Sequence, residues 1–218
     1  MKATWKVDAL ALTMIAAMFV LAAVNWSSAP SQMPVHWNWA GEPDRFGGRF
    51  EGLFGLPLAA AGVYALLLVL PRFDPRKKNY DAFAGAFAIM RTVVVGLLLG
   101  LDVVVLLWIR GERAHVNGVV AAEIGVALLL LGNYLPKVKS NWFIGVRTPW
   151  TLSSESSWRR THRLAGWLFT AGGALIVATA LAFPEFAPRV MIGSLVAAAG
   201  TSVIYSYFAW KNDPQRTV

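Results

Sequence analysis

Three residues that could perform acid–base chemistry or bind a metal lie close together within residues 34–49. They are His36, Glu42 and Asp44, and imidazole and carboxylate groups are common metal ligands and proton carriers. Their spacing matches no metal motif that we can defend, and Asp44 could instead pair with a neighbouring arginine. We therefore keep two interpretations of this segment, an ordered structural turn and a ligand or metal site.

Two further carboxylates, Asp102 and Glu123, interrupt long apolar runs. Charged groups inside a membrane are costly, so each suggests either a function or a buried partner. Counted from the ends of their runs, both belong to the same half of the bilayer as the segment with His36. We expect a polar cluster of His36, Asp44, Asp102 and Glu123 that is open to the outside and binds a ligand or a cation. The alternative is that Asp102 and Glu123 are neutral, or pair with an arginine such as Arg110, and only hold the helices together.

A second patterned segment covers residues 141–163. Its characteristic residues are Asn141, Gly145, Arg147, Thr148, Trp150, Thr151, Trp158 and His162. Ser153 or Ser154 can cap a helix whose first turn holds Glu155, and that helix would continue into the next apolar run. A basic helix with aromatic residues at a membrane surface is typical of an interfacial helix among anionic headgroups. That interpretation explains the arginines of the helix, but it explains poorly why Asn141 and Gly145 precede it.

The elements that must position these residues are six apolar runs. We expect spans at residues 9–24, 53–70, 92–109, 118–135, 164–183 and 190–210. Charged residues make up only 15% of the chain and gather between the runs. A helix needs about 20 apolar residues to cross a hydrocarbon core of about 30 Å. The sequence therefore predicts an all-α polytopic membrane protein, a bundle of six transmembrane helices with one long outer loop and one long inner loop.

Positive charge is distributed unevenly between the two sides that six spans define. Fourteen Lys and Arg residues fall on one side: Lys2, Lys6, Arg72, Arg76, Lys77, Lys78, Lys137, Lys139, Arg147, Arg159, Arg160, Arg163, Lys211 and Arg216. Five fall on the other side: Arg45, Arg49, Arg110, Arg113 and Arg189. Because cytoplasmic loops carry the excess of Lys and Arg, we expect both chain ends in the cytoplasm. The alternative is that the first run is a cleaved signal peptide, which would leave five spans and an outer N-terminus.

Composition and motifs weigh against several classes of function. The chain has no cysteine, which removes disulfides, zinc–thiolate sites and cysteine nucleophiles. The cytoplasmic loops explain the formal net charge of +8, so we expect the lipid bilayer as a partner and no direct binding of nucleic acid. No serine–histidine, metalloprotease or phosphate-binding motif is present. His162 should lie across the membrane from His36 and His115, so we expect no three-histidine metal site, and we assign no catalytic residue and no cofactor.

The two patterned segments together resemble the SdpI family of bacterial membrane proteins. The inner segment carries the resemblance at Asn141, Gly145, Val146, Arg147, Thr148, Trp150, Thr151, Leu152, Trp158, Thr161 and His162. The outer segment resembles, at Pro34, His36, Gly41, Asp44 and Gly47, an uncharacterised module that often precedes this region in the family. The resemblance implies a protein of the bacterial inner membrane. It also implies a two-span module at residues 1–80 and a four-span module at residues 81–218.

The family resemblance also implies what the protein does. The namesake of the family is an immunity protein against a secreted peptide toxin, and it is understood to hold a small DNA-binding repressor at the membrane. We therefore expect resistance to a secreted peptide toxin, signalling by sequestering a cytoplasmic repressor at the membrane, or both. The alternatives are a small membrane enzyme or transporter with a polar or metal site in the outer half of the bundle, and a structural protein without a ligand.

Overall fold

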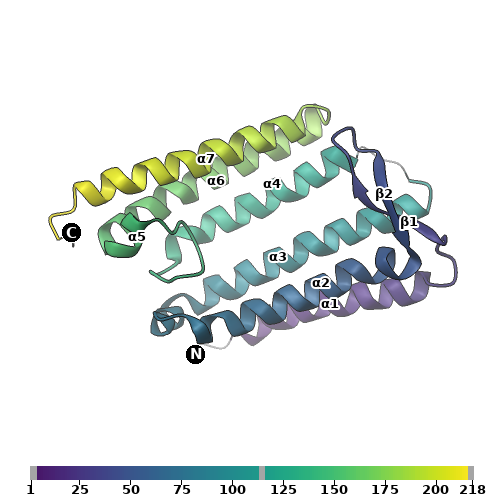
Figure 1. Ribbon diagram of the computed structural model, residues 1–218, viewed down its shortest axis with the longest axis horizontal. Helices are drawn as coiled ribbons and strands as arrows, with labels where there is room; N and C mark the ends of the chain where they lie inside the picture. Colours follow the sequence, from purple (N-terminus) through teal and green to yellow (C-terminus); the bar gives the residue numbers. More distant parts are fainter. Residues whose placement is uncertain (1–3, 113–115, 216–218) are drawn as a thin grey trace.

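The computed structural model describes residues 4–112 and 116–215, and these residues are mostly helical (Figure 1). Within them, six helices are long and apolar enough to cross a membrane. They are α1 (Trp5–Asn25), α2 (Arg49–Val69), α3 (Tyr80–Ile109), α4 (Val116–Tyr134), α6 (Glu155–Ala182) and α7 (Ala187–Lys211). The predicted all-α membrane bundle of six spans is confirmed. Lys2, Arg113, His115 and Arg216 lie outside the described residues.

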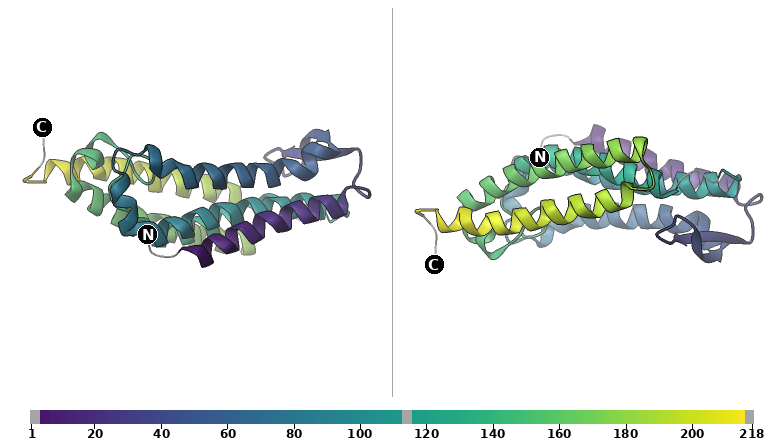
Figure 2. Two further views of the ribbon diagram at one scale, coloured as in Figure 1. Left: turned by 90° about the horizontal axis from the view of Figure 1, so that it is seen from below. Right: turned by 90° about the horizontal axis from the view of Figure 1, so that it is seen from above.

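Shorter elements lie at the two ends of the bundle. β1 (Gln32–Trp37) and β2 (Pro43–Gly48) form an antiparallel hairpin between α1 and α2. At the other end, η1 (Leu70–Phe73) and η2 (Lys77–Asn79) join α2 to α3, while η3 (Leu135–Lys137) and α5 (Pro149–Ser153) join α4 to α6. The start of α1 and the end of α7 also lie at this second end (Figures 1 and 2). We call the connection at residues 138–154 the cap, and the two ends of the molecule the hairpin end and the cap end.

The six long helices pack as two groups of three. In the first unit, α1, α2 and α3 surround a core that contains Ala11, Met18, Ala60, Tyr64 and Val95. In the second unit, α4 packs most extensively on α6, and α6 packs on α7. The two units meet where α3 runs beside α4 (Figure 1). The packing therefore groups α3 with α1 and α2. The two modules expected from the sequence, residues 1–80 and 81–218, instead group α3 with α4, α6 and α7.

Glycines allow α4 and α6 to approach each other closely. A Cβ on Gly132 would lie 2.8 Å from the carbonyl oxygen of Gly166, and a Cβ on Gly173 would lie 2.5 Å from that of Gly125. Neither distance leaves room for a methyl group, so a larger residue would push the two helices apart. Small residues have the same role at helix interfaces in membrane proteins generally. The second unit is therefore a closely packed body.

The outer surface of the bundle is apolar, as a surface that faces lipid must be. Leu66, Leu181 and Val196 expose 60%, 79% and 67% of their area. These residues lie on α2, α6 and α7, so the apolar surface covers both units. Burial of apolar residues inside the chain is thus only part of what stabilises the fold, because the bilayer covers the remainder.

All six long helices begin earlier than the apolar runs indicate, and two of them begin more than two turns earlier. α3 begins at Tyr80 rather than at residue 92, and α6 begins at Glu155 rather than at residue 164. The Ser154 hydroxyl accepts the backbone N–H of Ser157 at 2.9 Å, so the predicted serine cap and its continuation into the fifth span are confirmed. The additional turns contain charged residues, which is why a search for apolar runs does not include them.

Candidate functional site

At the hairpin end, the residues that could perform acid–base chemistry are His36 and Asp44. Their side chains face each other across the two strands. Nδ1 of His36 lies 2.5 Å from Oδ1 of Asp44, and the two side chains are 64% and 42% exposed. The strand register shifts at His36, and such bulges commonly redirect a side chain beside a functional site. Arg45 does not pair with Asp44, because its guanidinium lies 3.1 Å from the carboxylate of Glu51. The ordered turn expected here is a β-hairpin that presents an exposed histidine–carboxylate pair.

Two cavities lie beside the hairpin, and His36 lines both of them. A cavity of about 460 Å³ lies between the hairpin, α2, α3 and α4, and one of about 400 Å³ lies between the hairpin, α4 and α7. Asn117 on α4 donates a hydrogen bond from Nδ2 to the carbonyl oxygen of Trp39 at 2.6 Å. The hairpin therefore contacts both three-helix units and frames spaces that a bound side chain could enter.

Asp102 of α3 and Glu123 of α4 lie on opposite sides of the α3 backbone. Asp102 is 2% exposed and lies two helical turns from Val95, on the face of α3 that packs against α1 and α2. Glu123 projects from α4 against Gly100, which lies about half a turn around α3 from Asp102. The backbone of α3 therefore separates the two carboxylates.

The structure thus brings together only one pair of the expected outer cluster. His36 and Asp44 are partners, whereas Asp102 and Glu123 occupy two other places. Arg110 takes a different contact, because its guanidinium lies 3.5 Å from Oδ1 of Asn25. Among the described residues, no ion pair joins an arginine to Asp102 or Glu123.

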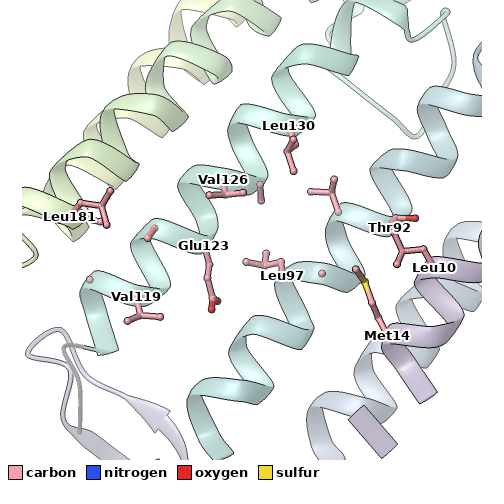
Figure 3. Close-up of a pocket in the computed structure, with 15 residues that line it drawn as sticks. Leu10, Met14, Thr92, Leu97, Val119, Glu123, Val126, Leu130 and Leu181 are labelled. Atoms are coloured by element: carbon pink, nitrogen blue, oxygen red, sulfur yellow. The ribbon is translucent and has the colours of Figure 1, made fainter. Parts of the chain in front are cut away.

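Glu123 is the ionisable residue of a cavity inside the bundle. The cavity has a volume of about 600 Å³ and lies between α1, α3, α4 and the end of α6, and Figure 3 shows the Glu123 carboxylate projecting into it. Its other lining residues are apolar except for Thr92. Oε2 of Glu123 is buried and makes no hydrogen bond. A carboxylate in such surroundings either carries a proton or pairs with a cation that enters the cavity.

At the cap end, Asn141 organises the cap from the inside. Its side chain is 0% exposed. Nδ2 donates to the carbonyl oxygens of Lys139 and Ile144 at 2.8 and 3.1 Å. Oδ1 accepts the backbone N–H groups of Phe143 and Ile144 at 2.9 and 2.6 Å. Because both ends of the amide are fully used, Asn141 determines the path of the chain here.

Asp74 joins the α2–α3 connection to the cap. It is 2% exposed and accepts hydrogen bonds from the Tyr80 hydroxyl at 2.9 Å and from the Trp142 backbone N–H at 2.9 Å. The guanidinium of Arg76 also joins this connection to the cap. It donates to Ser140 Oγ and, at 2.7 Å, to the carbonyl oxygen of Leu152. The two loops at this end are therefore one polar structure.

Gly145, Trp158 and His162 lock the cap onto α6. Gly145 has a φ of 106°, and a Cβ there would overlap Nε2 of His162. That Nε2 accepts the Val146 N–H at 3.1 Å, and Nδ1 donates to the Trp158 carbonyl at 2.8 Å, so the ring is neutral with its proton on Nδ1. The Trp158 ring stacks on His162 with centroids 4.0 Å apart, and its Nε1 donates to Val138 O at 2.8 Å. Both ring nitrogens of His162 are thus engaged, which leaves neither for a metal.

The burial of Trp158 corrects one interpretation of this stretch. Trp158 is 1% exposed and packs in a core with Tyr80, Phe83 and Phe87 of α3. An interfacial helix would expose this ring to the headgroups, so that interpretation is wrong for Trp158. The tryptophan is instead an anchor between the two units.

Thr148, Trp150 and Thr151 attach the cap to α7. Thr148 and Thr151 form a capping box at the start of α5, and Thr148 Oγ1 lies 3.0 Å from Ser206 Oγ on α7. The Trp150 ring meets the Tyr207 ring edge-on with centroids 5.3 Å apart. These motif residues are therefore explained by packing and hydrogen bonding within the chain.

Arg147 is the charged residue of the motif, and it is exposed. Its Nη1 donates to the Trp142 carbonyl at 2.8 Å, and the Trp142 side chain is itself 47% exposed. The cap therefore presents a cation and an aromatic ring on its outside, above a fully bonded interior.

Sequence reasoning missed a polar contact that joins α1, α2 and α3. Nη2 of Arg91 lies 2.6 Å from Oδ1 of Asp8, and the Tyr64 hydroxyl donates to the same oxygen at 3.1 Å. Opposite charges at the same ends of the first and third spans could have indicated this pair. Asp74 and Arg76 were also missed, because their partners lie in a loop far along the sequence.

A metal site is not formed by the described histidines and carboxylates. Within residues 4–112 and 116–215, no group of three or more His, Asp or Glu side chains is placed to hold a metal ion. His36 and His162 lie at opposite ends of the molecule, in the hairpin and in the cap-end part of α6.

Comparison with known proteins gives three findings. A model described as the SdpI/YfhL protein family matches residues 137–207, and a model described as DUF1648, a domain of unknown function, matches residues 13–61. Immunity protein SdpI of Bacillus subtilis (strain 168) is 23% identical over 206 residues, which cover 94% of this chain and 97% of the relative. No solved structure matches this chain.

The matched regions contain the two ends described above. The first includes the hairpin, and the second includes the cap together with α6 and most of α7, whereas Asp102 and Glu123 lie outside both. The resemblance that the two loop motifs indicate is therefore confirmed: this chain is a six-helix membrane protein similar to Immunity protein SdpI, with an SdpI/YfhL region that follows a DUF1648 region.

Proposed function

We propose that this protein protects a bacterial cell against a secreted peptide toxin, with its hairpin end outside and its cap end in the cytoplasm. The similarity to a protein named Immunity protein SdpI supports the first part of the proposal. The excess of Lys and Arg at the cap end supports this orientation, with both chain ends in the cytoplasm, and the inner membrane is the location that we propose.

The hairpin is the observation that carries this proposal. The described sheet has two strands, so each strand has one edge without a strand partner, and an extended peptide can add to such an edge. Trp39 and Phe46 are 75% and 49% exposed, and exposed aromatic rings are the residues that most often anchor a protein partner. A peptide that adds to the hairpin would lie near His36, Asp44 and the two cavities that His36 lines.

The test is survival of Bacillus subtilis cells from which Immunity protein SdpI has been removed, during exposure to the peptide toxin of that strain. Expression of this chain should restore growth. His36→Ala combined with Asp44→Ala should reduce protection without reducing the amount of protein in the membrane. Glu112→Ala is the control, since Glu112 is also an exposed carboxylate at the hairpin end. Unchanged killing in cells that contain the folded protein would contradict the proposal.

The cap end supplies the second part of the proposal, which is sequestration of a small DNA-binding repressor at the membrane. Arg147 and Trp142 are exposed next to each other, and arginine and tryptophan are the residues most enriched at binding hot spots. The polar network beneath them holds both in place, which lowers the entropy cost of binding.

Repressor binding is tested with a fluorescently labelled small DNA-binding repressor expressed in the same cells. Toxin should move the label to the membrane in cells with the wild-type chain, and Trp142→Ala with Arg147→Ala should leave it in the cytoplasm. The control is Trp5→Ala with Lys6→Ala, which removes another exposed aromatic–cation pair at the cap end and leaves the hairpin and the cap unchanged. A label that moves equally with the cap variant would exclude the cap surface.

A second candidate function is a small transporter, and the Glu123 cavity favours it. An unpartnered carboxylate in an apolar cavity between helices is typical of a binding site for a proton or a cation. The test is uptake or efflux of a lipophilic cation in vesicles that contain the purified protein. Glu123→Gln should abolish the flux, whereas Asp102→Asn, on the other face of α3, should not. Equal flux for Glu123→Gln and wild type would dismiss this candidate.

A further inference from the structure

A third cavity lies beside the start of α1, and its chemistry differs from that of the sites described above. It has a volume of about 550 Å³ and lies between the first turns of α1, the end of α2 and the first turns of α3. Leu68 of α2 and Ala84 and Phe87 of α3 form an apolar wall, whereas the exposed basic side chains come from the connection between these two helices. The helices therefore offer contacts that suit hydrocarbon, and the connection offers contacts that suit an anion.

The cavity exists because α1 and α3 do not begin at the same level. The Thr92 hydroxyl donates to the Val7 carbonyl at 3.3 Å, and Arg91 pairs with Asp8, so the first turns of α1 lie beside Arg91. α3 begins at Tyr80, which is about 16 Å earlier along the helix. The left view of Figure 2 shows the α2–α3 connection extending past the start of α1. The first turns of α3 therefore have no α1 residue from the described chain beside them.

The charge of this cavity is predominantly positive. The side chains of Arg72, Lys77 and Lys78 line it, are exposed, and make no hydrogen bond or ion pair within the described part of the chain. The Arg91–Asp8 pair is neutral overall, which leaves Asp81 as the one carboxylate of the lining without a basic partner. Three cations against one carboxylate favour an anionic ligand.

We propose that this cavity binds the headgroup of an anionic phospholipid. The phosphate would lie among Arg72, Lys77 and Lys78, and the first methylenes of an acyl chain would lie against Leu68 and Phe87. Basic pockets between helices at a membrane surface bind anionic headgroups in this way. A free phosphate would use the basic side alone, whereas a phospholipid uses the basic side and the apolar wall together.

The test compares retention of phosphatidylglycerol and phosphatidylcholine by the full-length protein in native mass spectrometry. Wild type should retain the anionic lipid preferentially. The variant Arg72→Gln, Lys77→Gln, Lys78→Gln should retain it about a hundredfold less, because three surface cations at about 1 kcal/mol each contribute about 3 kcal/mol to such binding. These side chains are exposed, so the variant should fold, as its elution and thermal unfolding will report.

The matched control is Arg159→Gln, Arg160→Gln, Arg163→Gln, which removes three exposed cations of α6 from the same end of the molecule. It should retain the anionic lipid as wild type does. Equal losses in the two triple variants would overturn the proposal, since the effect would then depend on total charge.

A third variant distinguishes binding of a lipid from binding of a free phosphate. Ala84→Trp fills the apolar wall and leaves the cations in place, so it should reduce lipid retention as well. If Ala84→Trp retains the lipid fully and millimolar inorganic phosphate displaces it from wild type, the cavity is a phosphate site and the proposal is wrong.

Discussion

The hairpin and the cap lie at opposite ends of the same helices, yet they use polar residues in opposite ways. The His36–Asp44 pair is exposed, and few of its atoms are engaged by the protein. Asn141, Asp74 and His162 are buried, and each makes several hydrogen bonds inside the chain. Two motifs that look alike in the sequence therefore have different roles. The polar side chains of the hairpin remain accessible to a partner, whereas most of those in the cap stabilise the fold of the chain.

The largest expected effect on stability is Asn141→Leu. The substitution leaves buried backbone groups without partners, so we expect the free energy of unfolding to fall by about 3 kcal/mol or more. Thermal unfolding in detergent measures this. The matched variant at the hairpin end is Asn38→Leu, whose amide oxygen accepts two backbone N–H groups in an exposed turn where water can replace it. If Asn38→Leu lowers the free energy of unfolding as much as Asn141→Leu does, polar residues at the two ends do not differ in their contribution to stability.

Gly145→Ala should have the next largest effect. The positive φ and the overlap of a Cβ with His162 should reduce the free energy of unfolding by about 2 kcal/mol. The hairpin-end control is Gly48→Ala, because Gly48 has a φ of −68° and open space around it. Calorimetry should show a lower Tm for Gly145→Ala and an unchanged Tm for Gly48→Ala.

Ser154→Ala should have a moderate effect, about 1 kcal/mol from loss of the helix cap. The Ser154 hydroxyl also donates to the Asp213 carboxylate at 2.5 Å, and this hydrogen bond lowers the pKa of Asp213. A lowered pKa means that the contact stabilises the folded protein at neutral pH and that this contribution disappears as the pH falls through that pKa. In Ser154→Ala, NMR titration should find the pKa of Asp213 closer to its ordinary value. An unchanged pKa would show that the hydroxyl does not hold this carboxylate.

His36→Ala should have the smallest effect on stability and a large effect on protection. An exposed pair of this kind contributes less than about 1 kcal/mol, so the Tm should hardly change. Survival under toxin is the second measurement. A variant that loses stability and protection in proportion would mean that the hairpin pair is structural, like the cap residues.

The apolar runs predict the helices well, because the membrane requires about 20 apolar residues for each span. They leave out the turns of α3 before Thr92, because Arg91 interrupts the apolar run there. The hairpin was expected only as an ordered turn, because two short strands with prolines and glycines give a weak alternation pattern.

The candidate sites were harder to predict than the helices. Whether Asp102 and Glu123 meet depends on the rotation of α3, where a shift of one residue turns a side chain by about 100°. The Asp74 network depends on which two loops lie together, and the spacing of residues in one loop contains no information about the other. His36 and Asp44 were found because both lie in one short segment.

The contact of α3 with α4 has a mechanical consequence for the whole molecule. It is the interface between the two three-helix units, and hydrogen bonds join the units at each end of it. At the hairpin end the bond comes from Asn117, and at the cap end the bonds come from Arg76 and Asp74. Because both sets of contacts join the same two units, a rotation of one unit against the other at one end would also have to be accommodated by the contacts at the other end.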